Sequence, residues 1–136
     1  MTWDAVIGGE EEKVFPTVSW IKSTLANVRH RSKKAERFVC LIRNEEDQLN
    51  ALCMDGAFIF EWYRKSAGGR LIASRAGEKP TECFEKPSLI ARFFGAKRQI
   101  QGSLFDLNEA ATIFEAYVNG ATEFPSIAWH RPKIAR

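Results

Sequence analysis

The stretch Leu104–His130, which reads LFDLNEAATIFEAYVNGATEFPSIAWH, predicts a helix with both ends marked, a tight turn and a short strand. Asp106 is the expected N-cap, because its carboxylate can accept hydrogen bonds from the free backbone N–H groups of the first turn. Glu109 can reach back to the N–H of the cap and complete a capping box. Gly120 stands where a left-handed residue ends a helix, and an extended run follows Pro125.

The helix predicted in this stretch has one broad apolar face. Its members recur at helical spacing and are Ala110, Ile113, Phe114, Tyr117 and Val118. In the strand that follows, Ile127 and Trp129 share one face, and Ala128 and His130 share the other. We expect Trp129 to be largely buried, because it lies on the same strand face as Ile127 and beside the helix.

The rest of the chain predicts a sheet of short strands with one early helix. A first strand is expected at 3–7 and is ended by Gly8, Gly9 and the glutamates at 10–12; a helical stripe then runs from Trp20 to about Arg29. Further strands are expected at 37–43, 49–54, 57–64, 70–75, 82–85 and 88–94. Short strands joined by short turns favour an antiparallel meander. The predicted class is α+β, in which residues 1–136 form a single domain, two amphipathic helices cover the sheet, and the C-terminal strand pairs back into it.

Composition and charge exclude several classes of protein. The 136 residues are 45% hydrophobic and 27% charged, with a net charge of +3, which is ordinary for a water-soluble domain. No apolar run approaches the roughly 20 residues that a membrane helix requires. The N-terminus lacks the basic start and apolar core of a signal peptide, so a cytoplasmic protein is expected.

Catalytic and metal-binding patterns are missing from the sequence. The three cysteines form no CxxC pair, and no histidine stands at ligand spacing from one of them. Cys40 and Cys53 lie inside apolar strand patterns, where burial would raise the thiol pKa and make them inert. No nucleophile elbow, Walker loop or dinucleotide-binding glycine pattern occurs. We therefore expect no enzyme activity, no cofactor and no metal.

Charged runs are the candidates for binding a partner. Glu45, Glu46 and Asp47 form an acidic turn, which is either solvated or part of an interface. Glu61 either faces solvent by strand alternation or binds a partner together with Tyr63. Trp62 is either a core residue or a surface anchor. The basic segment 29–37 leaves open a small nucleic-acid-associated adaptor, although no aromatic residue within it can stack on a base.

The C-terminal stretch resembles a known family. Phe114, Gly120, Pro125 and Trp129 stand at the places of a helix, a glycine, a proline and a strand ending in tryptophan. This arrangement is similar to the closing part of an immunity-protein family encoded beside bacterial polymorphic toxins, including contact-dependent growth-inhibition toxins. The resemblance implies that the chain binds one cognate toxin domain, often a nuclease or deaminase, and blocks its active site without catalysis.

The resemblance does not supply the binding residues, because its matching positions belong to the framework. Charge and strand alternation supply them instead. The residues predicted to bind the toxin are Glu45, Glu46, Asp47, Glu61, Trp62, Tyr63 and Arg64.

Overall fold

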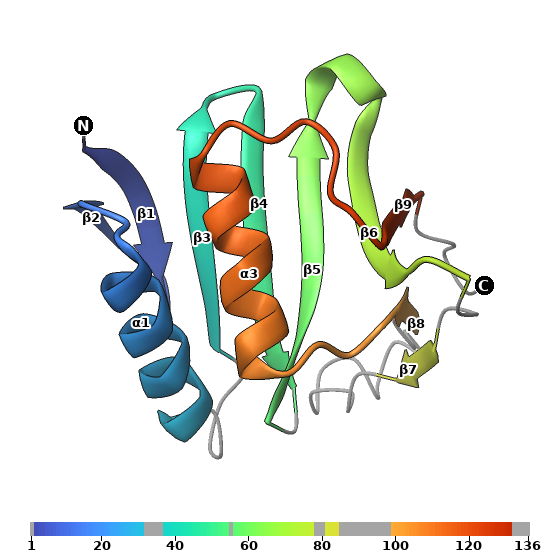
Figure 1. The fold of residues 1–136 in the computed structure, drawn as a ribbon, viewed down its shortest axis with the longest axis horizontal. Coiled ribbons are helices and arrows are strands. Elements are labelled where there is room, and N and C mark those ends of the chain that lie inside the picture. The colour runs from blue at the N-terminus through green and yellow to red at the C-terminus, as the bar shows by residue number, and fades with distance from the viewer. Residues whose placement is uncertain (1, 32–36, 55, 78–80, 85–98, 132–136) are drawn as a thin grey trace, which may run out of the picture.

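Seven strands form one antiparallel sheet in the order β2-β1-β3-β4-β5-β6-β9, and two further strands pair as β7-β8 (Figure 1). The structure is a computed structural model that describes residues 2–31, 37–54, 56–77, 81–84 and 99–131. The elements are β1 (Trp3–Ile7), β2 (Glu10–Val14), α1 (Val18–Arg31), β3 (Arg37–Asn44), β4 (Asp47–Met54), β5 (Ala57–Arg64), the short 3-10 helix η1 (Lys65–Ala67), β6 (Gly69–Arg75), β7 (Thr81–Phe84), β8 (Gln99–Gly102), α3 (Leu107–Val118) and β9 (Ile127–His130).

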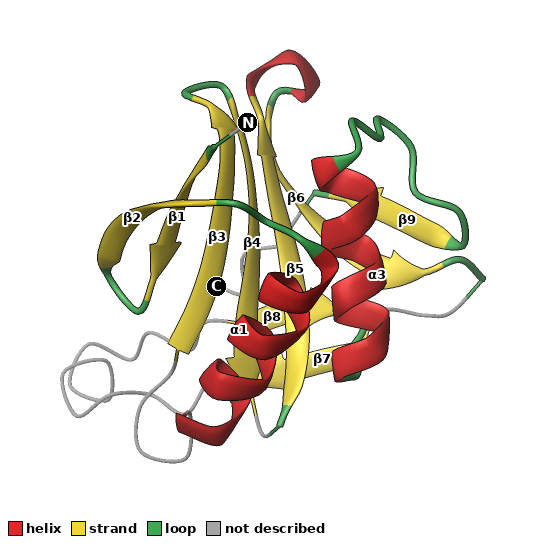
Figure 2. Ribbon diagram, turned by 60° about the vertical axis from the view of Figure 1, so that its left-hand side comes forward, coloured by secondary structure: helices red, strands yellow, loops and turns green. Residues whose placement is uncertain are grey.

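Both helices lie on the same side of the large sheet (Figure 2). Strand alternation places one set of apolar side chains beneath them, including Leu41 on β3, Leu49 on β4 and Phe60 on β5, each of which has no exposed surface. Among the described residues no helix lies over the opposite face, which is called the open face below, although Cys40, Ile59 and Ile72 are buried on it (Figure 2). The main core therefore lies between the sheet and the helices.

The predicted α+β class, the two covering helices and the closing strand are confirmed. Three expectations were wrong in detail. The acidic residues at 10–12 do not end the first strand but belong to β2, which pairs with β1. β4 begins at Asp47 rather than at Leu49. Trp129 is half-buried rather than largely buried. The strand expected at 88–94 lies outside the described residues.

The predicted ends of α3 are confirmed. The N–H of Glu109 donates to Asp106 Oδ1 at 2.8 Å, and the N–H of Asp106 donates to Glu109 Oε1 at 3.1 Å, which makes the capping box. At the other end Gly120 has a φ of +87°. The N–H of Ala121 donates to the Ala116 carbonyl at 3.0 Å, as in a Schellman motif. Local sequence thus fixes both the length of α3 and the direction in which the chain leaves it.

The segment before α3 forms hydrogen bonds with both β5 and β6, beyond the point where these two strands stop pairing with each other. Phe58 and Phe105 exchange two backbone hydrogen bonds of 2.8 Å, and the Ser103 N–H donates to the Ala73 carbonyl at 3.1 Å. A Cβ at Gly102 would lie 2.7 Å from Ile72 Cγ2 and 3.0 Å from the Ala73 carbonyl oxygen, so this close approach favours glycine. The start of α3 is therefore tied directly to the sheet.

Within the described part of the chain, neither helix is long and apolar enough to cross a membrane.

Candidate functional site

The seven residues predicted to bind a partner separate into three places. Two of them are on the exposed β3–β4 turn, two are on the open sheet face, and the other three lie at the covered side, at the end of the sheet where α3 finishes. The turn carries Glu45 and Glu46, and the open face carries Glu61 and Tyr63. The covered side carries Asp47, Trp62 and Arg64.

The β3–β4 turn presents Glu45 and Glu46 to solvent, beside the β5–β6 connection (Figure 1). The N–H of Glu46 donates to Asn44 Oδ1 at 2.8 Å, which holds the turn. The Lys65 ammonium lies 3.2 Å from Glu46 Oε1, and both side chains are about two-thirds exposed. Such a surface pair contributes only about 0–1 kcal/mol, so both carboxylates remain available to a partner.

Asp47, which the sequence analysis placed among the residues that bind a partner, points inward. Its Oδ1 accepts hydrogen bonds from Trp62 Nε1 at 2.7 Å and from the Tyr117 hydroxyl at 2.8 Å. Its Oδ2 accepts from Arg43 at 3.1 Å, and the same guanidinium donates to the Tyr117 carbonyl at 2.7 Å. Burial raises the pKa of Tyr117, and the hydrogen bond to Asp47 raises it further. Asp47 therefore joins the sheet to the C-terminal end of α3.

Trp62 lies in the core, which decides between the two positions that the sequence left open for it, a core residue and a surface anchor. Only 1% of it is exposed. Its ring makes edge-to-face contacts with Phe124 at 5.2 Å and with Trp129 at 5.1 Å between centroids. The guanidinium of Arg64 lies 4.4 Å from the indole centroid and covers it at the edge of the core. A partner therefore cannot reach Trp62 without opening the core.

The open face carries a shallow hollow around the other predicted pair, Glu61 and Tyr63. The Arg70 guanidinium donates to Glu61 Oε1 across the face. Tyr63 stands beside this ion pair and is 42% exposed. The hollow has a volume of about 290 Å³ and is lined by Val6, Phe38, Cys40, Gln48, Asn50, Glu61, Tyr63 and Arg70.

Cys40, which lines this hollow, is a buried thiol. Burial raises the pKa of its thiol to about 11, so the reactive thiolate is scarce at neutral pH. Among the described residues, no group of three histidine, cysteine, aspartate or glutamate side chains is placed to hold a metal ion. The hollow presents an aromatic ring, an ion pair and two amides to solvent.

A second and larger cavity was not predicted from the sequence. It is a groove of about 530 Å³ between α3 and the turn that leads into β9, and it is mostly apolar. Phe124, Pro125, Ser126 and Ile127 form one wall, and α3 forms the other with Asn108, Glu109, Thr112, Ile113 and Ala116. The wall at 124–127 is a turn in which Pro125 fits the second position and Ser126 has a φ of +64°.

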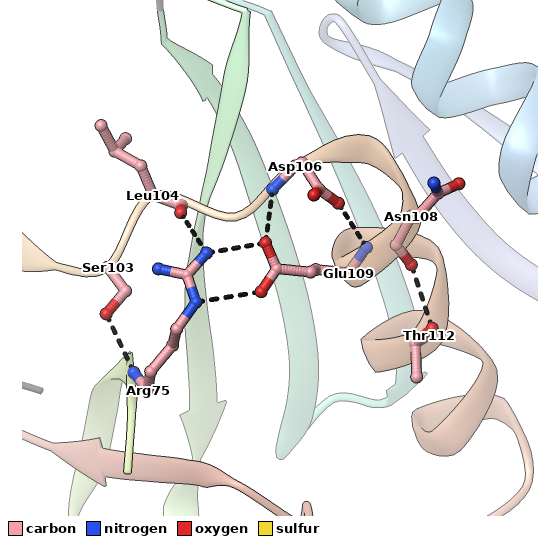
Figure 3. Close-up of polar contacts among 7 residues, drawn as sticks. All are labelled: Arg75, Ser103, Leu104, Asp106, Asn108, Glu109 and Thr112. Carbon is pink, nitrogen blue, oxygen red and sulfur yellow. Dashed lines mark hydrogen bonds and ion pairs between the residues drawn. The ribbon is translucent and has the colours of Figure 1, made fainter. Parts of the chain in front are cut away.

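One end of the groove is fixed by the ion pair of Arg75 and Glu109 (Figure 3). The guanidinium donates to the two carboxylate oxygens at 2.9 and 2.7 Å, and it also donates to the Leu104 carbonyl at 2.8 Å. The hydrogen bond from Arg75 lowers the pKa of Glu109, although partial burial opposes this. Sequence spacing identified Glu109 as a capping residue, but it held no signal that would find a partner on β6.

The lowered pKa of Glu109 predicts acid sensitivity. A carboxylate with a depressed folded-state pKa stabilises the fold above its unfolded-state pKa of about 4.3, and this stabilisation is lost as pH falls through the folded-state pKa. Glu109→Gln should therefore be less stable than the native chain at neutral pH, and the two melting temperatures should converge in acid. Melting curves at a series of pH values measure this, with exposed Glu123→Gln as the control. A constant gap across the series would contradict it.

The basic segment considered for nucleic-acid binding is described only in part. Arg29, His30 and Arg31 are exposed in the last turn of α1, where cations also complement the helix dipole. Residues 32–36 lie outside the described residues. The nucleic-acid alternative remains a prediction.

Neither a protein-family model, nor a curated protein, nor a solved structure matches this chain.

Proposed function

We propose that this chain is an immunity protein that binds a cognate toxin domain and blocks its active site without catalysis. The proposal rests first on the family resemblance of residues 110–129. The positions that carry this resemblance have framework roles in the fold: Gly120 ends α3 in the left-handed conformation, and Trp129 packs on Trp62. They account for how the sheet is closed and leave the open face to contact a partner.

The observation that carries the proposal is the open face around Tyr63. A standard protein interface buries roughly 800 Å² on each partner, which one sheet face and its adjacent turns can supply. Residues that dominate binding energy are enriched in tyrosine and arginine. Here Tyr63 stands half out of the surface beside the Glu61–Arg70 ion pair and a hollow that can accept a side chain.

Charge supports a basic partner in spite of the net charge of +3. Glu45 and Glu46 are exposed at the end of the sheet, where β3 turns into β4, whereas the charge of Glu61 is paired with Arg70 on the open face. Nuclease toxins have basic clefts for a polyanionic substrate, and acidic groups facing such a cleft speed association. The buried thiol of Cys40 supports a reducing compartment such as the cytoplasm.

The proposal is tested by the gene immediately upstream. We expect it to encode a large secreted protein with a variable C-terminal toxin domain. Co-expression should then yield a complex that survives purification and should rescue growth of cells that express the toxin domain. A toxin domain that neither binds this chain nor loses its toxicity would overturn the proposal.

Tyr63→Ala should weaken the complex by at least tenfold, as expected when an aromatic residue at the centre of an interface loses about 2 kcal/mol of binding. Titration calorimetry with the toxin domain measures this loss. Stability should change little, because Tyr63 is 42% exposed. Phe15→Ala is the matched control, because Phe15 is an aromatic residue that is 64% exposed and lies outside the open face. Equal affinity of both variants and the native chain would place the interface elsewhere.

A further inference from the structure

Two buried polar atoms in the hollow of the open face have no hydrogen-bond partner. One is the acceptor Asn50 Oδ1 on β4, and the other is the donor Arg70 Nε on β6; both residues line the hollow. Most buried polar atoms in folded proteins are paired, and an unpaired one lowers stability. An unpaired acceptor and an unpaired donor in one hollow therefore indicate a place that another molecule completes.

The residue between these two atoms explains why both stay unpaired. Glu61 on β5 lies directly opposite Asn50 in the register of the sheet, but a carboxylate has no proton to donate to Asn50 Oδ1. Glu61 instead accepts from Arg70, through a terminal nitrogen of the guanidinium. In the pair of Arg75 and Glu109, by contrast, Nε and a terminal nitrogen both donate to the carboxylate. The Glu61–Arg70 pair thus leaves the Nε of its guanidinium unused.

The charges of the hollow favour an uncharged ligand. Glu61 and Arg70 neutralise each other, so Arg70 would repel an inserted cation and Glu61 would repel an inserted anion. A ligand that pairs both free atoms needs an N–H group for Asn50 and an oxygen acceptor for Arg70, and a carboxamide carries both. The hollow has a volume of about 290 Å³, which is smaller than most small-molecule sites and suits one side chain.

We propose that the hollow binds the side-chain carboxamide of an asparagine or glutamine of the toxin domain. The amide nitrogen donates to Asn50 Oδ1, and the amide oxygen accepts from Arg70 Nε. Because both protein atoms are buried, side chains that line the hollow move aside as the amide enters. The identity of the partner rests on the proposed function, whereas the chemistry of the ligand rests on the hollow alone.

The chemistry is tested on the full chain without any toxin, using propionamide, which is the side-chain analogue of glutamine. An NMR titration follows the Arg70 Nε–H signal and the signals of the Asn50 side-chain amide. We expect both to shift saturably. Propionate and propylguanidinium carry an apolar part like that of propionamide together with a negative or a positive charge, and each should bind at least about tenfold more weakly.

Two variants remove the unpaired atoms one at a time. Asn50→Leu should weaken propionamide binding by about tenfold or more and should raise the urea midpoint, because a buried acceptor without a donor is removed. Arg70→Lys keeps the positive charge that faces Glu61 but lacks Nε, and it should also weaken binding. Asn27→Leu is the matched control, because Asn27 is exposed on α1, on the covered side of the sheet, and it should bind propionamide normally.

A native chain that shows no saturable shift with propionamide, or equal binding by Asn50→Leu and Asn27→Leu, would mean that water alone fills the hollow and would overturn the inference. The toxin domain provides a second arm, and it should bind Asn50→Leu about tenfold more weakly than Asn27→Leu. If it binds both variants equally well, the amide inference fails and the proposed function stands. If it binds neither the variants nor the native chain while propionamide still binds, the proposed function fails and the amide site stands.

Discussion

Asp47→Ala should lower the free energy of unfolding by about 3 kcal/mol, although Asp47 stands in an acidic run that looks like a solvated turn. The carboxylate accepts hydrogen bonds from three side chains: the Trp62 indole, the Tyr117 hydroxyl and the Arg43 guanidinium. Removing it leaves two buried donors and one half-buried cation without an acceptor. An unsatisfied buried donor costs about 1–3 kcal/mol, and a charged group costs more.

Urea denaturation of Asp47→Ala, Glu45→Ala and Glu46→Ala measures this difference. The two glutamate variants are matched controls, because they remove a carboxylate from the same turn where the side chain is exposed. Each should change stability by no more than about 1 kcal/mol. The stability of Asp47→Asn should lie between that of Asp47→Ala and that of the two glutamate variants, since an amide keeps one acceptor oxygen but loses the charge that faces Arg43. If all three alanine variants were equally stable, the inward network would contribute nothing.

This distinction decides how the toxin-binding proposal can be tested. Replacing Glu45, Glu46, Asp47 and Glu61 together would remove exposed carboxylates and a stabilising one at once. Lost binding would then be ambiguous between a damaged interface and a damaged fold. Variants restricted to Glu45, Glu46 and Tyr63 avoid this, because their side chains are exposed at the surface.

Local signals in the sequence predicted α3 and its ends. Asp106, Glu109 and Gly120 act within a few residues of one another, so their roles can be read without knowing the fold. The strands of the central meander were predicted for a similar reason, since alternation and turns are also local. β2 was missed because glutamate has low strand propensity, and its pairing with β1 overrides that preference.

Contacts between distant parts of the chain could not be predicted in this way. Asp47 and Tyr117 are separated by 70 residues, and Arg75 and Glu109 by 34. Strand alternation puts Trp62 on the same face as Phe58 and Phe60, but it does not say which face the helices cover. Alternation likewise puts Glu61 and Tyr63 on the other face of β5. That both helices lie on the opposite side of the sheet is known only from the structure (Figure 2).

Trp62→Ala should have the largest effect of any single change discussed here, about 3–5 kcal/mol of lost stability. The indole is 1% exposed and makes edge-to-face contacts with Tyr117, Phe124 and Trp129. Its removal opens a cavity among aromatic rings that cannot collapse easily, and it takes a donor from Asp47. Trp62→Phe should cost less, because it keeps most of the packing and loses mainly the hydrogen bond.

Trp129→Ala is the informative comparison, because Trp129 packs on Trp62 from the last strand of the sheet but is only half-buried. Trp129→Ala should therefore lower the free energy of unfolding by less than Trp62→Ala does, by roughly 2–3 kcal/mol. The two decreases should not add in the double variant, since the two rings are in contact. Chemical denaturation of both single variants and the double variant measures this coupling. If Trp129→Ala stayed fully stable and lost only toxin binding, this strand would be part of the interface, and the framework role given to the helix-Gly-Pro-Trp stretch would be wrong.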